Sequence, residues 1–322
     1  MTKPTFRMMA VPEPKMLRLL SLDGSVLPGL VRLTERLSEK HLAQLDDKLI
    51  VPPKLEVTYR FTRTFRWVAE IIQELPLTQS KHPVPAENAR RHILENTELL
   101  MHEVSAFAEY LTRLLSGLAG DDRRKEKAAL ASGRRLSHEV VHLFKLPINK
   151  LKHDGFRLSW CEARYNTSVI AGFTVHGRIG KGVTGPAHFH PKAQGIAEGY
   201  SFPLLLRKTI ETLYQLCFLT EAALLADIEV ELRPEPAANT TTSPGLLAAA
   251  SEALLLLPTL GRHGFPLENR HELLELLLDL NTVRVMRTFK LSPLKAGARI
   301  TFHHRVTLGE TVKPPFWPRS LI

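Results

Sequence analysis

Apolar residues recur at every third or fourth position along much of the N-terminal half, which is the spacing of helices that bury one face. The clearest stripe lies in residues 86–118, and Gly117 and Gly120 are expected to end that helix. Pro147 is expected to end the last helix of the series. Successive amphipathic helices with short connections predict the beginning of an antiparallel bundle. The helical stretches are 29–45, 55–75, 86–118 and 123–146.

After Gly155 the pattern changes to alternating apolar and polar residues rich in Val, Ile, Phe and Thr, which is typical of strands. Residues 156–162 and 167–179 predict one hairpin, and residues 282–291 and 298–308 predict a second at the C-terminus. We therefore expect an α+β fold, mainly a helical bundle with inserted and C-terminal β-hairpins. Further helices are expected at 203–226, 245–257 and 267–281.

The Pro- and Thr-rich stretch 233–244 is the best linker candidate in the chain. It predicts three parts: an N-terminal arm and helix (1–53), a helical bundle with a β-hairpin (54–232), and C-terminal helices with a hairpin (245–322). A chain of 322 residues is long enough for one large domain or two modest ones. One compact unit and two lobes divided at the linker therefore both stay open.

The net charge of +10 is unevenly distributed along the chain. Residues 123–157 hold 10 basic and 3 acidic side chains, and residues 284–322 hold 8 and 1. On the last expected strand, Arg299 and Arg305 lie on the face opposite the apolar one. If the two basic segments lie together in the fold, they form a surface for a polyanion. Nucleic acid is therefore a candidate partner.

Cys161 and Cys217 are too few for a disulfide framework or a cysteine-based zinc cluster. We expect two buried thiols in a reducing compartment. No apolar run reaches the ~20 uncharged residues that a membrane span needs, and the N-terminus carries no apolar segment of signal-peptide length. The chain is therefore expected to be cytoplasmic, without membrane contact.

The stretch 148–155 lies at the end of a predicted helix and reads INKLKHDG. It contains several polar and cationic residues next to apolar ones. Asn149 and His153 are four positions apart, so in a helical turn they share one face. An Asn can orient a phosphate or a hydroxyl, and a His can act as general acid or base near neutral pH. The two residues are therefore candidate catalytic groups.

Cations around this stretch are candidate nucleic-acid contacts. Lys150 and Lys152 would attract a phosphate backbone, assisted by Arg134 and Arg135 of the preceding helix. The alternative interpretation is a plain helix-to-strand junction, in which the lysines are solvated and Asn149 bonds freed backbone groups.

Residues 55–165, with this stretch, resemble the HEPN family of small helical-bundle proteins. Many members are metal-independent RNases of toxin–antitoxin and phage-defence systems. Their motif is an Arg, a polar residue that is often Asn, a short gap and a His. Asn149 and His153 match the polar and His positions, whereas Ile148 stands in place of the Arg. Without a guanidinium to stabilise the charge of a phosphorane, the resemblance implies a member that binds RNA rather than cleaves it.

A second register of the same motif exists upstream. Arg135 and His142 have the permitted gap between them, but Leu136 occupies the polar position.

The segment from His138 to His142 reads His-Glu-Val-Val-His and resembles the zinc-binding helix of metallopeptidases. In that reading His138 and His142 are zinc ligands and Glu139 is the general base. The surrounding cations oppose a dication, and solvent-facing helix residues are the alternative. The third ligand would come from Glu162, His188 or His190.

A third hypothesis is a non-enzymatic structural subunit whose apolar helices dock on partner proteins or on a second copy of the chain. The sequence thus leaves three functions open: an RNA-binding protein of HEPN-like type without a cofactor, a zinc-dependent hydrolase, and a structural subunit.

Overall fold

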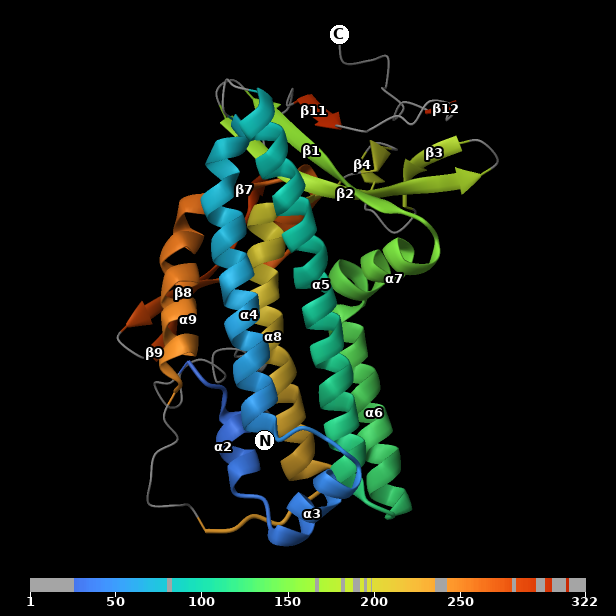
Figure 1. Cartoon of the computed structure of the whole chain (residues 1–322), viewed down its shortest axis with the longest axis vertical. Helices are drawn as coiled ribbons and strands as arrows, with labels where there is room; N and C mark the ends of the chain where they lie inside the picture. Colours follow the sequence, from blue (N-terminus) through green and yellow to red (C-terminus); the bar gives the residue numbers. More distant parts are fainter. Residues whose placement is uncertain are drawn as a thin grey trace, which may run out of the picture.

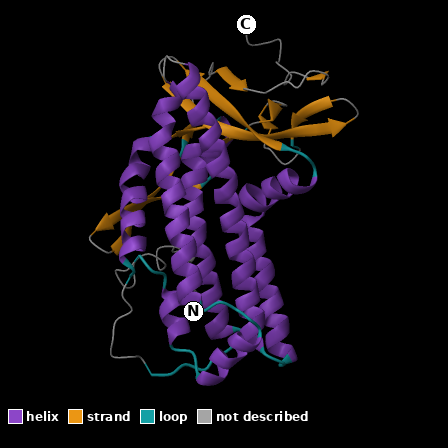
Figure 2. Cartoon of the chain, viewed as in Figure 1, coloured by secondary structure: helices purple, strands orange, loops and turns teal. Residues whose placement is uncertain are grey.

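A bundle of long helices forms the body of the molecule, and a β-sheet lies across one end of it (Figures 1 and 2). The computed structural model describes residues 26–79, 83–165, 168–180, 183–187, 192–193, 196–197, 199–234, 242–279, 282–293, 299–302 and 311–312. This arrangement is the expected α+β fold with mainly helical character.

Four long helices run side by side along the bundle (Figure 1). They are α4 (Pro53–Glu74), α5 (Pro83–Ala119), α6 (Arg123–Val140) and α8 (Phe202–Ala226). α5 has 37 residues and is therefore about 55 Å long, and it is the longest of the described helices. The helices predicted from apolar periodicity at 55–75, 86–118 and 203–226 are confirmed. A further helix, α9 (Pro244–Leu256), packs on α4 and confirms the one expected at 245–257.

Aromatic rings hold the centre of the bundle together. Phe61 of α4 meets Phe107 of α5 and Tyr214 of α8 edge-to-face, with ring centroids 5.9 and 5.1 Å apart. The Tyr214 hydroxyl donates a hydrogen bond of 2.9 Å to the carbonyl oxygen of Val26, so its polar atom is satisfied inside the core. One hydrophobic cluster continues from this point through the bundle to the buried residues of α9.

The sheet is built on the hairpin expected after Gly155. β1 (Arg157–Tyr165) and β2 (Ser168–Gly180) pair antiparallel along the whole of β1, which confirms this prediction. The strand order is β11-β1-β2-β3-β12, and β6 also pairs with β2. The other strands of this sheet are β3 (Val183–Pro186), β6 (Tyr200–Ser201), β11 (Arg299–Phe302) and β12 (Thr311–Val312).

The stretch 29–45 is two short helices, and the prediction of one helix was wrong. α2 (Gly29–Glu35) and α3 (Glu39–Asp47) are separated because the backbone between them bonds to a distant segment. The amide of Ser38 donates to the Glu231 carbonyl, 3.0 Å away, and the carbonyl of Arg36 accepts from the Arg233 amide, 2.6 Å away. These groups can then make no helical bonds.

The described part of the stretch 267–281, residues 267–279, is not the expected α-helix. A short 3₁₀ turn, η4 (Pro266–Arg270), leads into β8 (Glu272–Asp279), which pairs antiparallel with β9 (Thr282–Lys290). The predicted strand at 282–291 is confirmed, but its partner is β8. β11 pairs instead with β1, so within the described residues β9 and β11 do not form the expected C-terminal hairpin.

Two carboxylates favour the strand, one on α8 and one within the Leu-rich run itself. Glu211 of α8, itself buried, accepts a hydrogen bond from the Leu274 amide, and Glu275 pairs with Arg262 and Arg287. Leu273, Leu274 and Leu276 meanwhile pack on the core.

The helix expected at 123–146 is divided, and Pro147 begins a helix instead of ending one. α6 stops at Val140, a π-helical segment η2 (Val141–Lys145) follows, and α7 (Leu146–His153) then turns away from the axis of α6 (Figure 1). Pro147 lies in the first turn of α7, where the backbone N–H that proline lacks would have no partner within the helix.

The remaining short elements are η1 (Leu75–Gln79), β4 (Lys192–Ala193), β5 (Ile196–Ala197), η3 (Leu257–Leu260), β7 (His263–Gly264) and β10 (Ser292–Pro293).

Replacing Phe61 by Ala tests the aromatic centre of the bundle. The fully buried ring is expected to leave a cavity between three helices and to lower the free energy of unfolding by about 3–5 kcal/mol. The control is Leu55→Ala on the same helix, where the side chain is 62% exposed and a change within about 0.5 kcal/mol is expected. Urea denaturation followed by circular dichroism measures both. Equal losses for the two variants would contradict this description of the core.

Candidate functional site

The solvent face of α7 carries three of the residues that the sequence singled out. Asn149, Lys152 and His153 are all exposed, whereas Pro147 and Ile148 are buried. With 100° between successive residues of a helix, the three polar side chains lie within an arc of about 100°. Asn149 and His153 therefore share one face, as their spacing predicted, and Lys152 stands beside them.

The inward side of α7 makes apolar contacts with two hydrophobic clusters. Ile148 belongs to the main hydrophobic core. Leu151 packs in addition against a small cluster made of Phe156, Val175 and Ala187, which attaches the helix to β2 and to the segment after β3. α7 is thus held by the bundle and the sheet together, so the orientation of its polar face is determined.

The two lysines of α7 have different surroundings. The ammonium of Lys150 lies 2.5 Å from the Asp154 carboxylate and 5.4 Å from the centre of the Phe156 ring. Its charge is therefore partly compensated within the junction. Across the part of the chain that the structure describes, Lys152 makes no ion pair, and neither does Arg157 at the start of β1. These two cations are open to an external anion.

His102 of α5 is a neighbour of this face that the sequence reasoning missed. It is half-buried, and burial lowers its pKa below the ordinary value of 6.5. The positive charge of Lys152 lowers this pKa further, and the carboxylate of Glu98 opposes the shift. The imidazole of His102 therefore reports on the charge carried by α7. No local spacing marks it, because the contact joins helices that are far apart in sequence.

Among the other predicted nucleic-acid contacts, Arg134, Arg135 and Arg299 lie away from α7. Arg134 and Arg135 are exposed on α6, about 20 Å before Asn149 along the helical path. Arg299 is opposite Arg164 near the far end of β1, about 23 Å along the strand from Arg157. Arg305 lies outside the described residues. The expected convergence of the two basic segments is therefore not seen for Arg299.

The His-Glu-Val-Val-His segment spans the end of α6 and the start of η2. His138, Glu139 and His142 are all exposed, and Glu139 accepts a hydrogen bond of 2.8 Å from the side-chain amide of Gln215 on α8. In the described part of the chain, no three His, Cys, Asp or Glu side chains gather into a metal site.

Of the third-ligand candidates, the structure describes Glu162, which lies on β1. Glu162 is buried, where it accepts hydrogen bonds from Arg90 and from the indole of Trp160 at 3.1 and 2.8 Å. His188 and His190 lie outside the described residues.

Both cysteines are free and buried, as expected. Burial raises the pKa of each thiol well above its usual range, which keeps them protonated and unreactive. No helix among the described residues has the length and apolar character needed to cross a membrane.

Comparison of the chain with protein-family models, with curated proteins and with solved structures finds no match.

Removing the charge of Lys152 tests the geometry of this site. In Lys152→Met the pKa of His102 is expected to rise, and in Glu98→Gln it is expected to fall, as measured by NMR titration of the imidazole. The matched control is Lys127→Met, which removes the same charge from an exposed position near the other end of α6. An unchanged His102 pKa in Lys152→Met would show that the two side chains are not neighbours.

The same contact makes a prediction about stability and pH. Because the native pKa of His102 lies below the unfolded value, the unfolded chain binds more protons between the two values. The stability contribution of the neutral imidazole is therefore complete above pH 6.5 and is lost as the pH falls through the native pKa. In Lys152→Met the loss of unfolding free energy between pH 8 and pH 5 is expected to be smaller than in the unmodified protein. Urea denaturation at the two pH values measures it, and an equal loss in both proteins would contradict the assignment.

Proposed function

We propose that this protein is a cytoplasmic RNA-binding protein that holds the phosphate backbone on the solvent face of α7. The observation that carries the proposal is the arrangement of Asn149, Lys152 and His153 on one exposed face of a helix whose other side is buried. An ammonium, an imidazole and an amide on one side can together donate several hydrogen bonds to phosphate oxygens. Such contacts position a nucleic acid without reading its sequence.

Arg157 extends this face toward the sheet. It is exposed at the first residue of β1, four positions after His153, and within the described residues it has no carboxylate partner. Arg134 and Arg135 offer a further cationic position on α6 for a longer strand. A nucleic acid that lies along α7 would thus meet several uncompensated charges, which favours salt-dependent binding.

Binding without cleavage is part of the proposal. In the motif that resembles the HEPN family, Ile148 takes the place of the Arg, and its side chain is buried in the core. A guanidinium that stabilises a developing phosphorane would have to lie on the solvent face beside Asn149 and His153. The burial of this position supports a role for Asn149 and His153 in holding RNA. On the same resemblance, we propose a place in a phage-defence or toxin–antitoxin system.

The cytoplasmic location is supported by the cysteines. Two free, buried thiols without a disulfide are typical of proteins in a reducing compartment.

Fluorescence anisotropy with a single-stranded RNA of about 20 nucleotides tests the proposal. The logarithm of the affinity is expected to fall linearly with the logarithm of the salt concentration. Lys152→Met should weaken binding to all sequences and reduce that slope by about 1. Lys127→Met, which removes a charge far from α7, should behave like the unmodified protein. The RNA should remain intact after incubation.

Several results would overturn the proposal. Affinity and salt slope that stay unchanged in both Lys152→Met and the double variant Asn149→Ala/His153→Ala would remove α7 from the interface. Cleavage of the RNA that is lost in His153→Ala would replace binding by catalysis. One equivalent of bound zinc that is lost in His138→Ala would favour the zinc-dependent hydrolase instead.

A further inference from the structure

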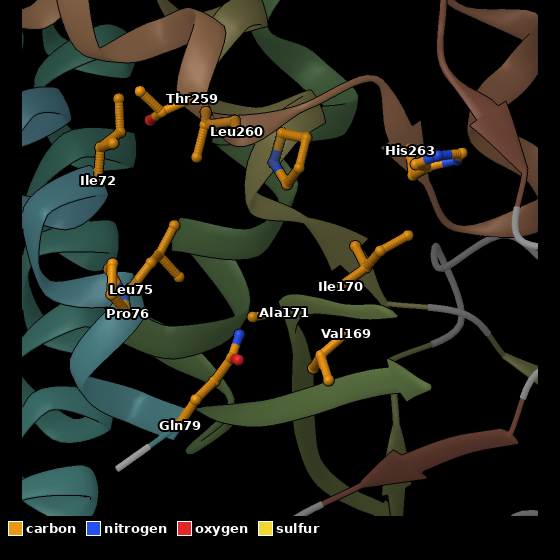
Figure 3. A pocket seen from close by; sticks show the side chains of 11 residues that line it. Ile72, Leu75, Pro76, Gln79, Val169, Ile170, Ala171, Thr259, Leu260 and His263 are labelled. Carbon is orange, nitrogen blue, oxygen red and sulfur yellow. The ribbon is translucent and has the colours of Figure 1, made fainter. Parts of the chain in front are cut away.

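A pocket of about 480 Å³ lies between η1, β2 and η3 (Figure 3). Its walls are mainly apolar, with Ile72, Pro203 and Leu260 contributed by three separate elements. Its polar side chains are Gln79, Thr259 and His263, and no Asp, Glu, Lys or Arg side chain lines it. Figure 3 shows Gln79 reaching from η1 toward the strand at Ala171. A pocket of this volume and character suits large apolar side chains rather than charged groups.

The pocket runs along the edge of β2. Three consecutive strand residues, Val169, Ile170 and Ala171, line it. Because successive side chains of a strand point to opposite faces, a cavity that touches all three must lie at the strand's edge and not over one face. The wall on this side therefore includes backbone as well as side chains.

Among the described residues, this edge of β2 has no strand partner at the pocket. β1 pairs with β2 on one side from Ser168 onward, whereas on the other side β6 begins opposite Gly172 and β3 opposite His176. Among the described residues, no strand pairs with Ser168–Ala171 on that second side. Alternate residues of an antiparallel strand direct both N–H and C=O to the same side, so two of these four residues present their backbone groups toward the opening.

We propose that this groove binds an extended, uncharged segment of a partner protein, which adds to β2 as an extra strand. The backbone of Ser168–Ala171 forms hydrogen bonds with the added strand. Every second side chain of that strand points toward the pocket, which binds an apolar one. An open apolar edge is a template for pairing unless it is charged or covered, and Val169, Ile170 and Ala171 carry no charge. The site is separate from the polar face of α7.

The test uses an acetylated, amidated eight-residue peptide with an uncharged centre in which valine and leucine alternate with threonine. One lysine at each end, outside this centre, keeps the peptide in solution. Hydrogen–deuterium exchange followed by mass spectrometry reads the backbone amides of residues 168–171 in the full chain. Added peptide is expected to slow their exchange, and isothermal titration calorimetry gives the affinity. A second peptide with the same side chains but N-methylated at alternate residues is expected to bind at least about tenfold more weakly, because it cannot complete the backbone hydrogen bonds.

Variants of the protein separate the edge from the pocket. Val169→Lys places a charge on the strand edge, and Thr259→Trp puts a bulky ring at the exposed side of the pocket. Both are expected to lower the peptide affinity at least about tenfold. The matched control is Val51→Lys, at an exposed valine just before α4, and it should bind as the unmodified protein does.

Three outcomes would overturn the proposal. The amides of residues 168–171 could remain unprotected at millimolar peptide. The N-methylated peptide could bind as well as its parent, which would leave a simple apolar pocket. A concentration-dependent dimer that Val169→Lys abolishes would make a second copy of this chain the occupant. None of these results bears on RNA binding at α7, so the two proposals fail independently.

Discussion

The apolar contact beneath α7 determines which residues this protein presents at its candidate site. Ile148 is anchored in the main core, and Leu151 is anchored in the cluster against β2. Once these two side chains are buried, the helical period leaves Asn149, Lys152 and His153 on the solvent side. The proposed function therefore depends less on any one polar residue than on the fixed rotation of this helix.

The sequence predicted features that depend on local spacing and missed those that depend on distant partners. The long helices were predictable because each carries its own apolar stripe, and so was the shared face of Asn149 and His153. The strand at 272–279 was not, because leucines at most positions suit a helix or a strand equally, and a carboxylate 63 residues away, that of Glu211, helps to decide the outcome. The position of His102 beside α7 is of the same kind, since no sequence pattern links the two helices.

β2 connects the two candidate surfaces. At Val175 it packs on the cluster that holds α7, and four residues earlier, at Ala171, it borders the pocket. The separation along the strand is about 13 Å. One surface is polar and cationic and the other is apolar with an open backbone edge, so they suit different ligands. The hairpin of β1 and β2 contributes to both surfaces and keeps them apart along one strand.

The central claim is that RNA binds at α7, and mapping the residues that contact RNA tests it most directly. Photochemical crosslinking of a 4-thiouridine-containing RNA, followed by mass spectrometry of the crosslinked peptides, locates the contact without any substitution in the chain. Crosslinks on the segment 149–157 are the predicted result. Crosslinks confined to residues 299–322, with none on α7 or the first residue of β1, would contradict the account.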